Sequence, residues 1–436
     1  MIKTIELEGY RLLDDFKADL GPLTVVIGAN ATGKSTLISA LQLITSCVGL
    51  PLREVIAWAG GLNSILSASG KAEQVTWRLT FAKPLDHPFW KMVPLEGNQY
   101  YVYEVTITRD SYGEPTPVSE VLRSEKPYDG YEQPLKFLDA TPHKSLVFSQ
   151  KEQRLVSFDE APGENALPLF GRKGSVSDNR ESNEAFQPAQ LSEQVKSLRL
   201  AQMRFINEYP IPSWTRALLS TFAFYPGFDV GRSSAIRTKP SEIRPATVLS
   251  GNGEDLGTVL HEIQTRAEFR DAADEIQEFL RVAYPSFDGV FAETSYEMPP
   301  KVLVRVRERG MRRKMEAWEL SDGMLRFLCL SAALLNPIPP AFIAIDEPEV
   351  GLHPRLLPIV ADMIKTASER TQVFVTTHSP DLLNCFDIDE VAVMAREENK
   401  IEWKRPGDRV TLKKMLETVT GETLGDLHRS GELEAL

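Results

Sequence analysis

A short stretch near the start of the sequence has the residue types and the spacing that bind phosphate. It reads Gly28-Ala-Asn-Ala-Thr-Gly33-Lys34-Ser35-Thr36 and matches the pattern Gly-x4-Gly-Lys-Ser/Thr. In such a loop, backbone N–H groups surround the phosphates of a nucleotide, the lysine reaches the β and γ oxygens, and the hydroxyl binds Mg²⁺. The candidate nucleotide-binding residues are therefore Asn30, Gly33, Lys34, Ser35 and Thr36, and Ser35 is also a candidate metal ligand.

The residues on either side decide whether this stretch is a phosphate loop or an empty glycine-rich turn. Leu23 to Ile27 form a short β-branched run between a Gly-Pro pair and the loop, which predicts a buried strand. After the loop, apolar residues recur at helical spacing as far as Val48, and Gly49 marks the end of the helix. A strand, a loop and a helix in this order direct the free amides of the helix N-terminus at an anion, which favours the phosphate loop.

A pair of acidic residues follows an apolar run in the last third of the chain. Phe342 to Ile345 predict a buried strand, and Asp346 and Glu347 come directly after it. An aspartate at the end of a core strand beside a phosphate loop can hold Mg²⁺, and an adjacent glutamate can orient or deprotonate the attacking water. Many strands end in acidic residues, so the structural alternative for Asp346 is a helix cap.

One of the six histidines stands at the end of another predicted strand. Val373 to Val375 form this strand, and His378 follows it in the sequence TTHSP. A neutral imidazole at this position can donate to a γ-phosphate oxygen and sense its loss. A purely structural histidine is the alternative, and we assign no chemistry to the other histidines, which are His87, His143, His261, His353 and His428.

A second helix start lies upstream of the acidic pair. Leu320-Ser321-Asp322-Gly323 leads directly into an apolar helical segment. Ser321 is a suitable N-cap, and that role alone explains a serine there. Because helix N-termini also bind anions, Ser321 and Gly323 are candidates for contact with a second phosphate group.

The order of these motifs resembles that of the ABC-type ATPases of the SMC/RecF/OLD group. The resemblance covers residues 1–65 and about 315–436, through GANATGKST, LSDG, AIDEPEVGLHP and TTHSP. It implies an α/β fold: a P-loop NTPase of ABC/RecF type with a mixed central sheet, an antiparallel β-subdomain and a helical insertion. It also implies hydrolysis of ATP with Mg²⁺ in a homodimer or larger oligomer, where the signature helix of one subunit caps the nucleotide held by the phosphate loop of the other.

The resemblance also implies a role for each motif. The implied roles are phosphate binding for Lys34, Mg²⁺ binding for Ser35 and Asp346, catalysis for Glu347 and His378, contact with the γ-phosphate bound to the partner for Ser321 and Gly323, and a place near the nucleotide for Arg11. The sequence departs from the motifs of this family in three places, and these differences bear on the coupling between lobes more than on nucleotide binding. Ala31 replaces a usual loop glycine, Asp322 replaces the second glycine of the signature, and no clear counterpart of the linking glutamine follows residue 50.

Composition bounds the class of protein. The sequence is 42% hydrophobic and 25% charged, which is ordinary for a globular protein, and it contains no long apolar run typical of a membrane span and no signal-peptide core. Its three scattered cysteines form no metal-ligand spacing and no disulfide framework, so we expect a cytoplasmic protein. We expect three parts: residues 1–150 as ATPase lobe I with the phosphate loop and the β-subdomain, 151–300 as a helical insertion with a mobile loop at 158–190, and 301–436 as ATPase lobe II.

A net charge of −12 argues against a protein coated by nucleic acid. A local basic strip is still present in residues 301–314, where valines alternate with basic residues and predict a strand with one apolar face. This strip is either a solvated hairpin or a contact for DNA or an acidic partner. Its candidate contact residues are Arg305, Arg307, Arg309, Arg312 and Arg313.

The function that these motifs favour is a switch driven by ATP. The resemblance points to the ATPase subunit of a bacterial anti-phage defence system that acts with a separate effector protein, often a Toprim-type nuclease. The alternative is a RecF-like DNA-binding ATPase of recombinational repair. A self-sufficient nuclease is disfavoured because the sequence has no second acidic cluster, and a transporter ATPase is disfavoured by the long insertion between the motifs.

Overall fold

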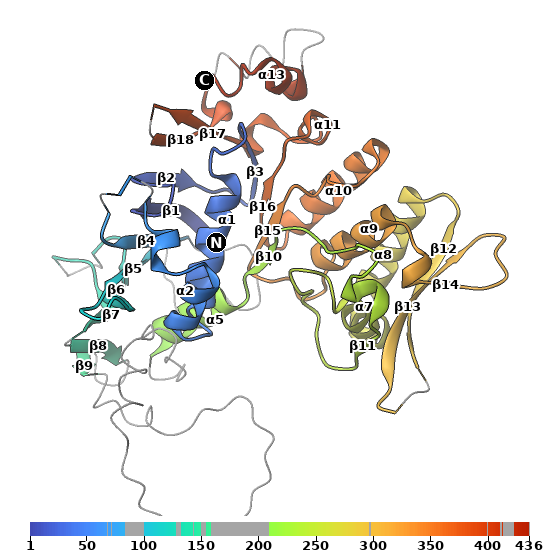
Figure 1. The fold of residues 1–436 in the computed structure, drawn as a ribbon, viewed down its shortest axis with the longest axis horizontal. Helices are drawn as coiled ribbons and strands as arrows, with labels where there is room; N and C mark the ends of the chain where they lie inside the picture. Colours follow the sequence, from blue (N-terminus) through green and yellow to red (C-terminus); the bar gives the residue numbers. More distant parts are fainter. Residues whose placement is uncertain are drawn as a thin grey trace, which may run out of the picture.

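The computed structural model describes residues 1–82, 100–127, 132–149, 154–157, 209–409, 412 and 423–435, apart from positions 68, 71, 143, 296, 297 and 399. Its strands form three sheets, with helices between and beside them (Figure 1). The described α-helices are α1 (Lys34–Ser46), α2 (Leu52–Trp58), α3 (Leu62–Ile65), α5 (Pro210–Ser220), α6 (Ala235–Thr238), α7 (Leu256–Thr265), α8 (Arg270–Ala283), α9 (Asp322–Leu334), α10 (Leu357–Ser368), α11 (Pro380–Leu383) and α13 (Leu424–Ser430).

The first sheet is antiparallel and contains eight strands in the order β2-β1-β4-β5-β6-β7-β8-β9. Its strands are β1 (Ile2–Glu8), β2 (Phe16–Asp19), β4 (Val75–Phe81), β5 (Tyr101–Arg109), β6 (Pro115–Ser124), β7 (Lys136–Thr141), β8 (Lys144–Ser149) and β9 (Arg154–Ser157). Alternate residues of β1 such as Ile5 and Leu7 are buried, so one face of this strand packs on the core. The predicted antiparallel β-subdomain is therefore confirmed.

The central sheet contains the strands that carry the motifs. Its order is β10-β15-β16-β3-β17-β18, and only β17 and β18 are antiparallel. Its strands are β10 (Ala223–Tyr225), β15 (Phe342–Asp346), β16 (Gln372–Thr376), β3 (Leu23–Ile27), β17 (Val391–Glu397) and β18 (Lys400–Lys404). Because β15, β16 and β3 are parallel neighbours, the loops that follow them meet at one edge of the sheet. This topology confirms the predicted mixed central sheet.

The central sheet is covered on both faces, which explains why its inner strands read as continuous apolar runs. On one face, Val26 and Phe374 share a core with α1 and the first sheet. The indole N–H of Trp77 on β4 donates to the carbonyl oxygen of Ala40 on α1 at 3.1 Å, so α1 lies between the two sheets. On the other face, Val25 and its neighbours pack with residues of α7, α8, α9 and α10.

The helical region, which contains α7, α8 and α9, carries the third sheet at its outer side (Figure 1). The strands are β11 (Ser241–Glu242), β12 (Phe287–Thr294), β13 (Lys301–Glu308) and β14 (Met315–Glu316), and their pairings are antiparallel. The helical insertion predicted within residues 151–300 contains α7 and α8. Val302, Val304 and Val306 of β13 are buried, so the predicted apolar face of this strand is confirmed as well.

The loop predicted at 158–190 lies outside the described residues, as does the part of the predicted insertion that follows it up to residue 208. Within the described ranges, no helix has the length and the apolar character that a membrane crossing needs.

Candidate active site

The phosphate loop joins β3 to α1 in a conformation that depends on its glycines. Gly28 has a φ of 150°, and a Cβ atom there would lie 2.3 Å from the carbonyl oxygen of Met394. Gly33 occupies the N-cap position of α1 with a φ of 95°, in the left-handed region that favours glycine. No side chain caps this helix, so the amides of its first turn face the loop without a side-chain acceptor.

Lys34 lies inside this loop. Its residue is only 6% exposed, and Nζ donates to the carbonyl oxygens of Gly28 at 2.7 Å and Ala29 at 3.1 Å. Burial lowers the pKa of Lys34, and the nearby negative charges of Glu347, Asp346 and Glu434 act against this shift. The sequence motif therefore gathers a buried cation, helix amides and two acidic residues in one region.

The acidic pair is held by the neighbouring strand. The backbone N–H of Glu347 donates to the carbonyl oxygen of Thr376 at 3.1 Å, and the Thr376 hydroxyl donates to the carboxylate of Asp346. Glu347 adopts a φ of 48°, a conformation that few residues with a Cβ adopt. Backbone strain of this kind persists only where the surrounding structure holds the residue in place. Here the hydrogen bond from the Glu347 N–H to Thr376 of β16 holds it.

His378 faces Glu347 from the loop after β16. Its Nε2 atom lies 3.7 Å from Oε1 of Glu347. Burial and then the positive charge of Lys34 lower the pKa of His378, while Glu347 and Glu349 act in the opposite direction. The imidazole is thus favoured in its neutral form, which is the form predicted from the sequence.

Glu349 is a residue of this site that the sequence analysis missed. Its Oε1 atom accepts hydrogen bonds from the Thr377 hydroxyl at 2.6 Å and from the backbone N–H of His378 at 2.9 Å. Its other oxygen, Oε2, is buried and makes no hydrogen bond with the part of the chain that the structure describes. Glu349 therefore ties the loop after β15 to the loop that carries His378, and the sequence signal was the third acidic residue in Asp-Glu-Pro-Glu.

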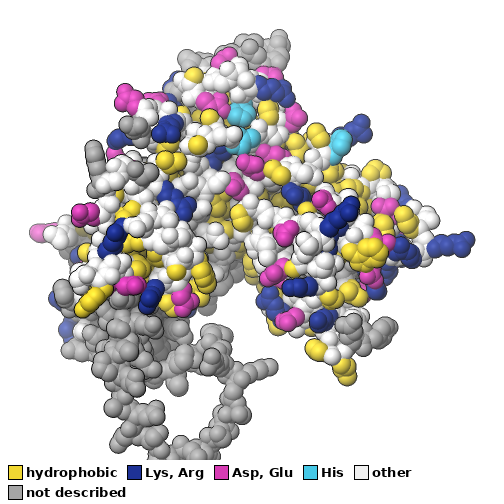
Figure 2. Space-filling model, viewed as in Figure 1, with side chains coloured by type: hydrophobic (Ala, Val, Ile, Leu, Met, Phe, Trp, Pro, Cys, Tyr) yellow, Lys and Arg dark blue, Asp and Glu magenta, His cyan; other side chains and the backbone are white. Residues whose placement is uncertain are grey.

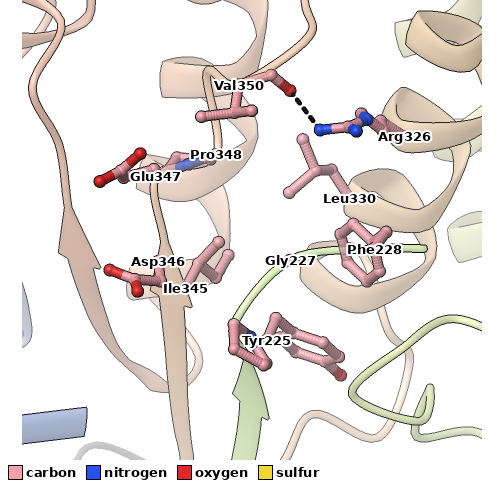
Figure 3. Close-up of a pocket in the computed structure, with 11 residues that line it drawn as sticks. Tyr225, Gly227, Phe228, Arg326, Leu330, Ile345, Asp346, Glu347, Pro348 and Val350 are labelled. Carbon is pink, nitrogen blue, oxygen red and sulfur yellow. Dashed lines mark hydrogen bonds between the residues drawn. The ribbon is translucent and has the colours of Figure 1, made fainter. Parts of the chain in front are cut away.

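A pocket of about 230 Å³ lies behind the acidic pair (Figure 3). The loop after β10, from Tyr225 to Phe228, forms one wall, and Arg326 and Leu330 of α9 form another. In Figure 3 the carboxylates of Asp346 and Glu347 both point away from Arg326, whose Nη1 donates to the carbonyl oxygen of Val350 at 2.9 Å. The loop after β10 could not be assigned a role from the sequence, because the three residues of this strand are too few to show a periodicity.

The segment 423–435 brings two further ionisable groups to this region. His428 Nδ1 and Glu434 Oε1 are 2.6 Å apart, and their charges act on His378 and Lys34 respectively. On the face seen in Figure 2, histidine and acidic side chains gather at the upper centre, near the ends of β3 and β16. His428 thus lies nearer to this site than its sequence context indicated, because α13 packs on α11, which follows His378 directly.

The candidate signature lies on another part of the helical region. Ser321 is the N-cap of α9, and its Oγ accepts from the backbone N–H of Met324 at 3.2 Å, as predicted. Gly323 approaches the backbone of Gly351, in the loop after the acidic pair, so closely that a Cβ would lie 3.2 Å from its carbonyl oxygen. Among the described residues, Ser321 and Gly323 make no hydrogen bond to the phosphate loop of the same chain.

Arg11 lies beside the end of α3. Its Nε donates to the carbonyl oxygen of Ser64 at 3.0 Å, and its backbone N–H donates to the carbonyl oxygen of Ile65 at 3.0 Å. Leu13, two residues on, contacts the position of Gly33. The segment around Arg11 thus adjoins the loop, although the guanidinium is occupied by the end of α3.

The basic strip is largely neutralised by acidic neighbours. Arg305 pairs with Glu293 and Glu316, each at 3.0 Å, and other basic residues of the strip pair in the same way. Those other pairs are Arg307 with Asp288, Arg313 with Glu319, and Lys314 with Glu293. Arg309 and Arg312 make no ion pair with the described residues. This pairing fits the solvated hairpin better than a surface for DNA.

Two family models match separate parts of the chain. The model described as an AAA ATPase domain matches residues 1–48, and the model described as an AAA domain, putative AbiEii toxin, Type IV TA system, matches residues 237–384. A curated relative, the OLD nuclease of Thermus scotoductus, is 38% identical over 53 residues, which are 12% of this chain. The match spans only 10% of the length of that relative.

Two solved structures share the fold over nearly the whole chain. One is an SMC head bound to the C-winged helix domain of ScpA, with a TM-score of 0.51 at 14% identity, covering 92% of this chain and 97% of that chain. The other is an SMC head domain with an extended coiled coil, bound to the C-terminal domain of ScpA and derived from Pyrococcus furiosus. Its TM-score is 0.53 at 13% identity, and the alignment covers 96% of this chain and 99% of that chain.

Proposed function

Since this chain is an SMC/RecF/OLD-like ATPase of the ABC type, we propose that two copies close around ATP and that hydrolysis reopens them. One observation carries this proposal. Lys34, Asp346 and His378 follow neighbouring strands at one sheet edge, whereas Ser321 caps a helix that makes no hydrogen bond to this phosphate loop among the described residues. Two half-sites separated in one chain become complete sites when two chains meet head to tail.

The phosphate-loop side fits a triphosphate. Among the described residues, the Lys34 ammonium donates only to carbonyl oxygens of its own loop, and the first-turn amides of α1 have no side-chain cap, so a phosphate group would meet donors on both sides. Ser35 and Asp346 are the residues that would hold Mg²⁺, which neutralises charge that develops on the phosphates. Asn30, Thr36 and Arg11 complete the nucleotide-binding set.

Binding of Mg²⁺ here does not require a site in which every ligand is a protein side chain. No group of three or more His, Cys, Asp or Glu residues in the described ranges has the arrangement of a metal site. Mg²⁺ commonly binds through one or two protein oxygens together with substrate phosphates and water. A single carboxylate such as Asp346 beside the Ser35 hydroxyl is compatible with that pattern.

The reaction assigned to the site is attack of water on the γ-phosphate. Glu347 accepts the proton of the water, and the bond between the γ-phosphate and the β-phosphate oxygen breaks to leave ADP. Neutral His378 donates to a γ-phosphate oxygen, and Lys34 remains a cation against the β and γ oxygens. A general base of this kind contributes about 10²–10⁴-fold to a rate.

Solvent exposure supports closure by a second copy. The side chain of Glu347 is 39% exposed, so bulk water reaches the catalytic group in a single chain. Exclusion of water strengthens the electrostatic interactions in a site and prevents unproductive reactions. Ser321 and Gly323 of the partner would cover this opening and contact the γ-phosphate.

We further propose that the chain is the ATPase and sensor subunit of a bacterial anti-phage system with a separate effector. The matches to a putative AbiEii toxin model and to an OLD nuclease support this assignment. Purification of the tagged Glu347→Gln variant from its host with ATP tests it, with Lys34→Ala as the control. A nuclease retained only by Glu347→Gln supports the proposal, and retention of DNA without an effector chain would contradict it.

Dimerisation itself is tested by the molar mass of the Glu347→Gln variant in light scattering. With ATP and Mg²⁺ the variant should double its mass, and with ADP it should not. Glu369 is an exposed acidic residue at the end of α10, and Glu369→Gln is the matched control. This control hydrolyses ATP, so its molar mass should return to the value measured without nucleotide. A Glu347→Gln chain that binds ATP and keeps the mass of one copy at every concentration would remove the proposal.

A further inference from the structure

Arg237 is a buried arginine whose hydrogen bonds converge on the signature loop. Its side chain is only 5% exposed and lies on α6, about eighty residues before the signature in sequence. Nη1 donates to the carbonyl oxygen of Leu320 at 2.6 Å and also approaches those of Ala317 at 3.2 Å and Trp318 at 3.4 Å. Nη2 donates to the Asp322 carboxylate at 2.5 Å.

The same guanidinium holds a second loop. Its Nε atom donates to the carbonyl oxygen of Val230 at 2.7 Å. Val230 lies in the segment between β10 and α6, and residues 225–228, just before it, line the pocket beside Asp346 and Glu347. One rigid fork therefore joins a loop next to the catalytic acids to the loop that begins the signature helix.

The ion pair also explains an aspartate at an unusual position. Asp322 is 63% exposed, and it stands between Ser321 and Gly323, where the proposed function brings the γ-phosphate of the other copy. An unpaired carboxylate there would repel the phosphate. Pairing with Arg237 offsets that charge and also fixes the direction of the carboxylate, because Arg–carboxylate geometry is specific.

We propose that Arg237 is a positioning residue for the reaction of the dimer. It keeps the signature loop at a fixed place relative to the loop after β10 and neutralises Asp322, so that Ser321 and Gly323 reach the nucleotide bound by the partner. This inference rests on the proposed composite site. Arg237 also connects the acidic pair to the signature in a sequence that has no clear counterpart of the linking glutamine.

The test compares Arg237→Lys with Arg244→Lys. A lysine keeps the charge and loses the fork, so it cannot hold Val230, Leu320 and Asp322 together. Arg244 is the control, since it pairs with Asp255 at 2.9 Å and, within the described ranges, forms no hydrogen bond to the signature loop. Both variants are made in the wild-type chain for kinetics and in the Glu347→Gln chain for dimerisation.

The inference predicts a split between binding and turnover. Arg237→Lys should bind ATP in the single chain with unchanged affinity, lower kcat by about 10- to 100-fold, and raise the concentration needed for the ATP-bound dimer, since misplacement by about 1 Å has effects of this size. Arg244→Lys should match its parent in all three measurements. Equal kcat and equal dimerisation for Arg237→Lys would overturn the inference.

Two further comparisons separate a folding defect and a failure of the proposed dimer from a failure of the role of Arg237. If Arg237→Lys fails to fold, Asp322→Asn tests the same ion pair at an exposed side chain, and it should again lower kcat and leave ATP affinity unchanged. An Asp322→Asn chain with parental kcat would show that the Arg237–Asp322 ion pair does not place the signature loop. If Glu347→Gln alone does not dimerise with ATP, the proposed function fails, whereas failure of Arg237→Lys to differ from a dimerising parent rejects only the role of Arg237.

Discussion

Oε1 of Glu347 and Nε2 of His378 lie 3.7 Å apart, although the two residues belong to loops after different strands. This separation is longer than a hydrogen bond, so neither group satisfies the other. Each remains available to a third group between them. In an ATPase of this type, that place suits the attacking water and the γ-phosphate, which makes the pair the centre of the chemistry proposed for this chain.

Replacing Glu347 with Gln should remove turnover and keep ATP binding. The amide cannot accept the proton of the water, so kcat should fall by about 10²–10⁴-fold while the Kd for ATP changes little. Phosphate release and fluorescent-nucleotide binding measure the two quantities. Glu369→Gln should behave as wild type, and a Glu347→Gln enzyme with normal kcat would exclude Glu347 as the base.

Lys34→Ala should weaken the binding of ATP. The ammonium is a charged donor inside the loop, and loss of such a hydrogen bond is worth about 1.5–3 kcal/mol, or about 10- to 100-fold in Kd. Titration with ATP by calorimetry checks this. Lys400→Ala removes an exposed lysine that pairs with Asp15 and should leave the Kd unchanged. An unchanged Kd for Lys34→Ala would argue against the phosphate loop.

The rate should depend on pH through His378. Burial and the charge of Lys34 disfavour the protonated imidazole and lower its pKa, so the active neutral form should dominate above the ordinary histidine value of about 6.5. Turnover should therefore be level between about pH 7 and 8 and should fall only below about 6.5. Initial rates across this range, measured for wild type and His378→Gln, check the assignment. An acid limb centred above pH 7, or one unchanged in His378→Gln, would contradict it.

Glu349→Ala should lower both stability and turnover. It leaves the Thr377 hydroxyl and the His378 N–H without their acceptor, a loss of about 1–3 kcal/mol for buried donors. Urea unfolding gives the change in the free energy of unfolding, and kcat reports the displacement of His378. Glu349→Gln retains an acceptor oxygen and should lose less of both. Equal behaviour of Ala and wild type would mean that Glu349 does not hold this loop.

The sequence predicted those parts of the fold whose signals are local. The apolar run at β3, the helical spacing in α1 and the N-cap Ser321 of α9 each lie within one element, and the structure has them close to the expected bounds. The motif order placed β15 and β16 beside β3 only through the resemblance, since strand order is not a local property.

Residues that act through tertiary contacts were not predicted. Glu349, Arg237 and Glu434 are charged residues in segments of mixed composition, and their roles depend on which chain segment lies opposite. The basic strip was ambiguous for the same reason. Its acidic partners on β12 and near β14 come from other parts of the chain, and alternation along one strand cannot reveal them.

The central claim is that each active site is built from two chains, and mixing two inactive variants tests it most directly. Lys34→Ala loses its own phosphate loop, and Ser321→Arg loses the signature that serves the partner. A mixed dimer retains one site in which both halves are intact, so the mixture should regain ATP turnover that neither variant has alone. A mixture that is no more active than the sum of its parts, or a Ser321→Arg chain with full activity by itself, would contradict the account.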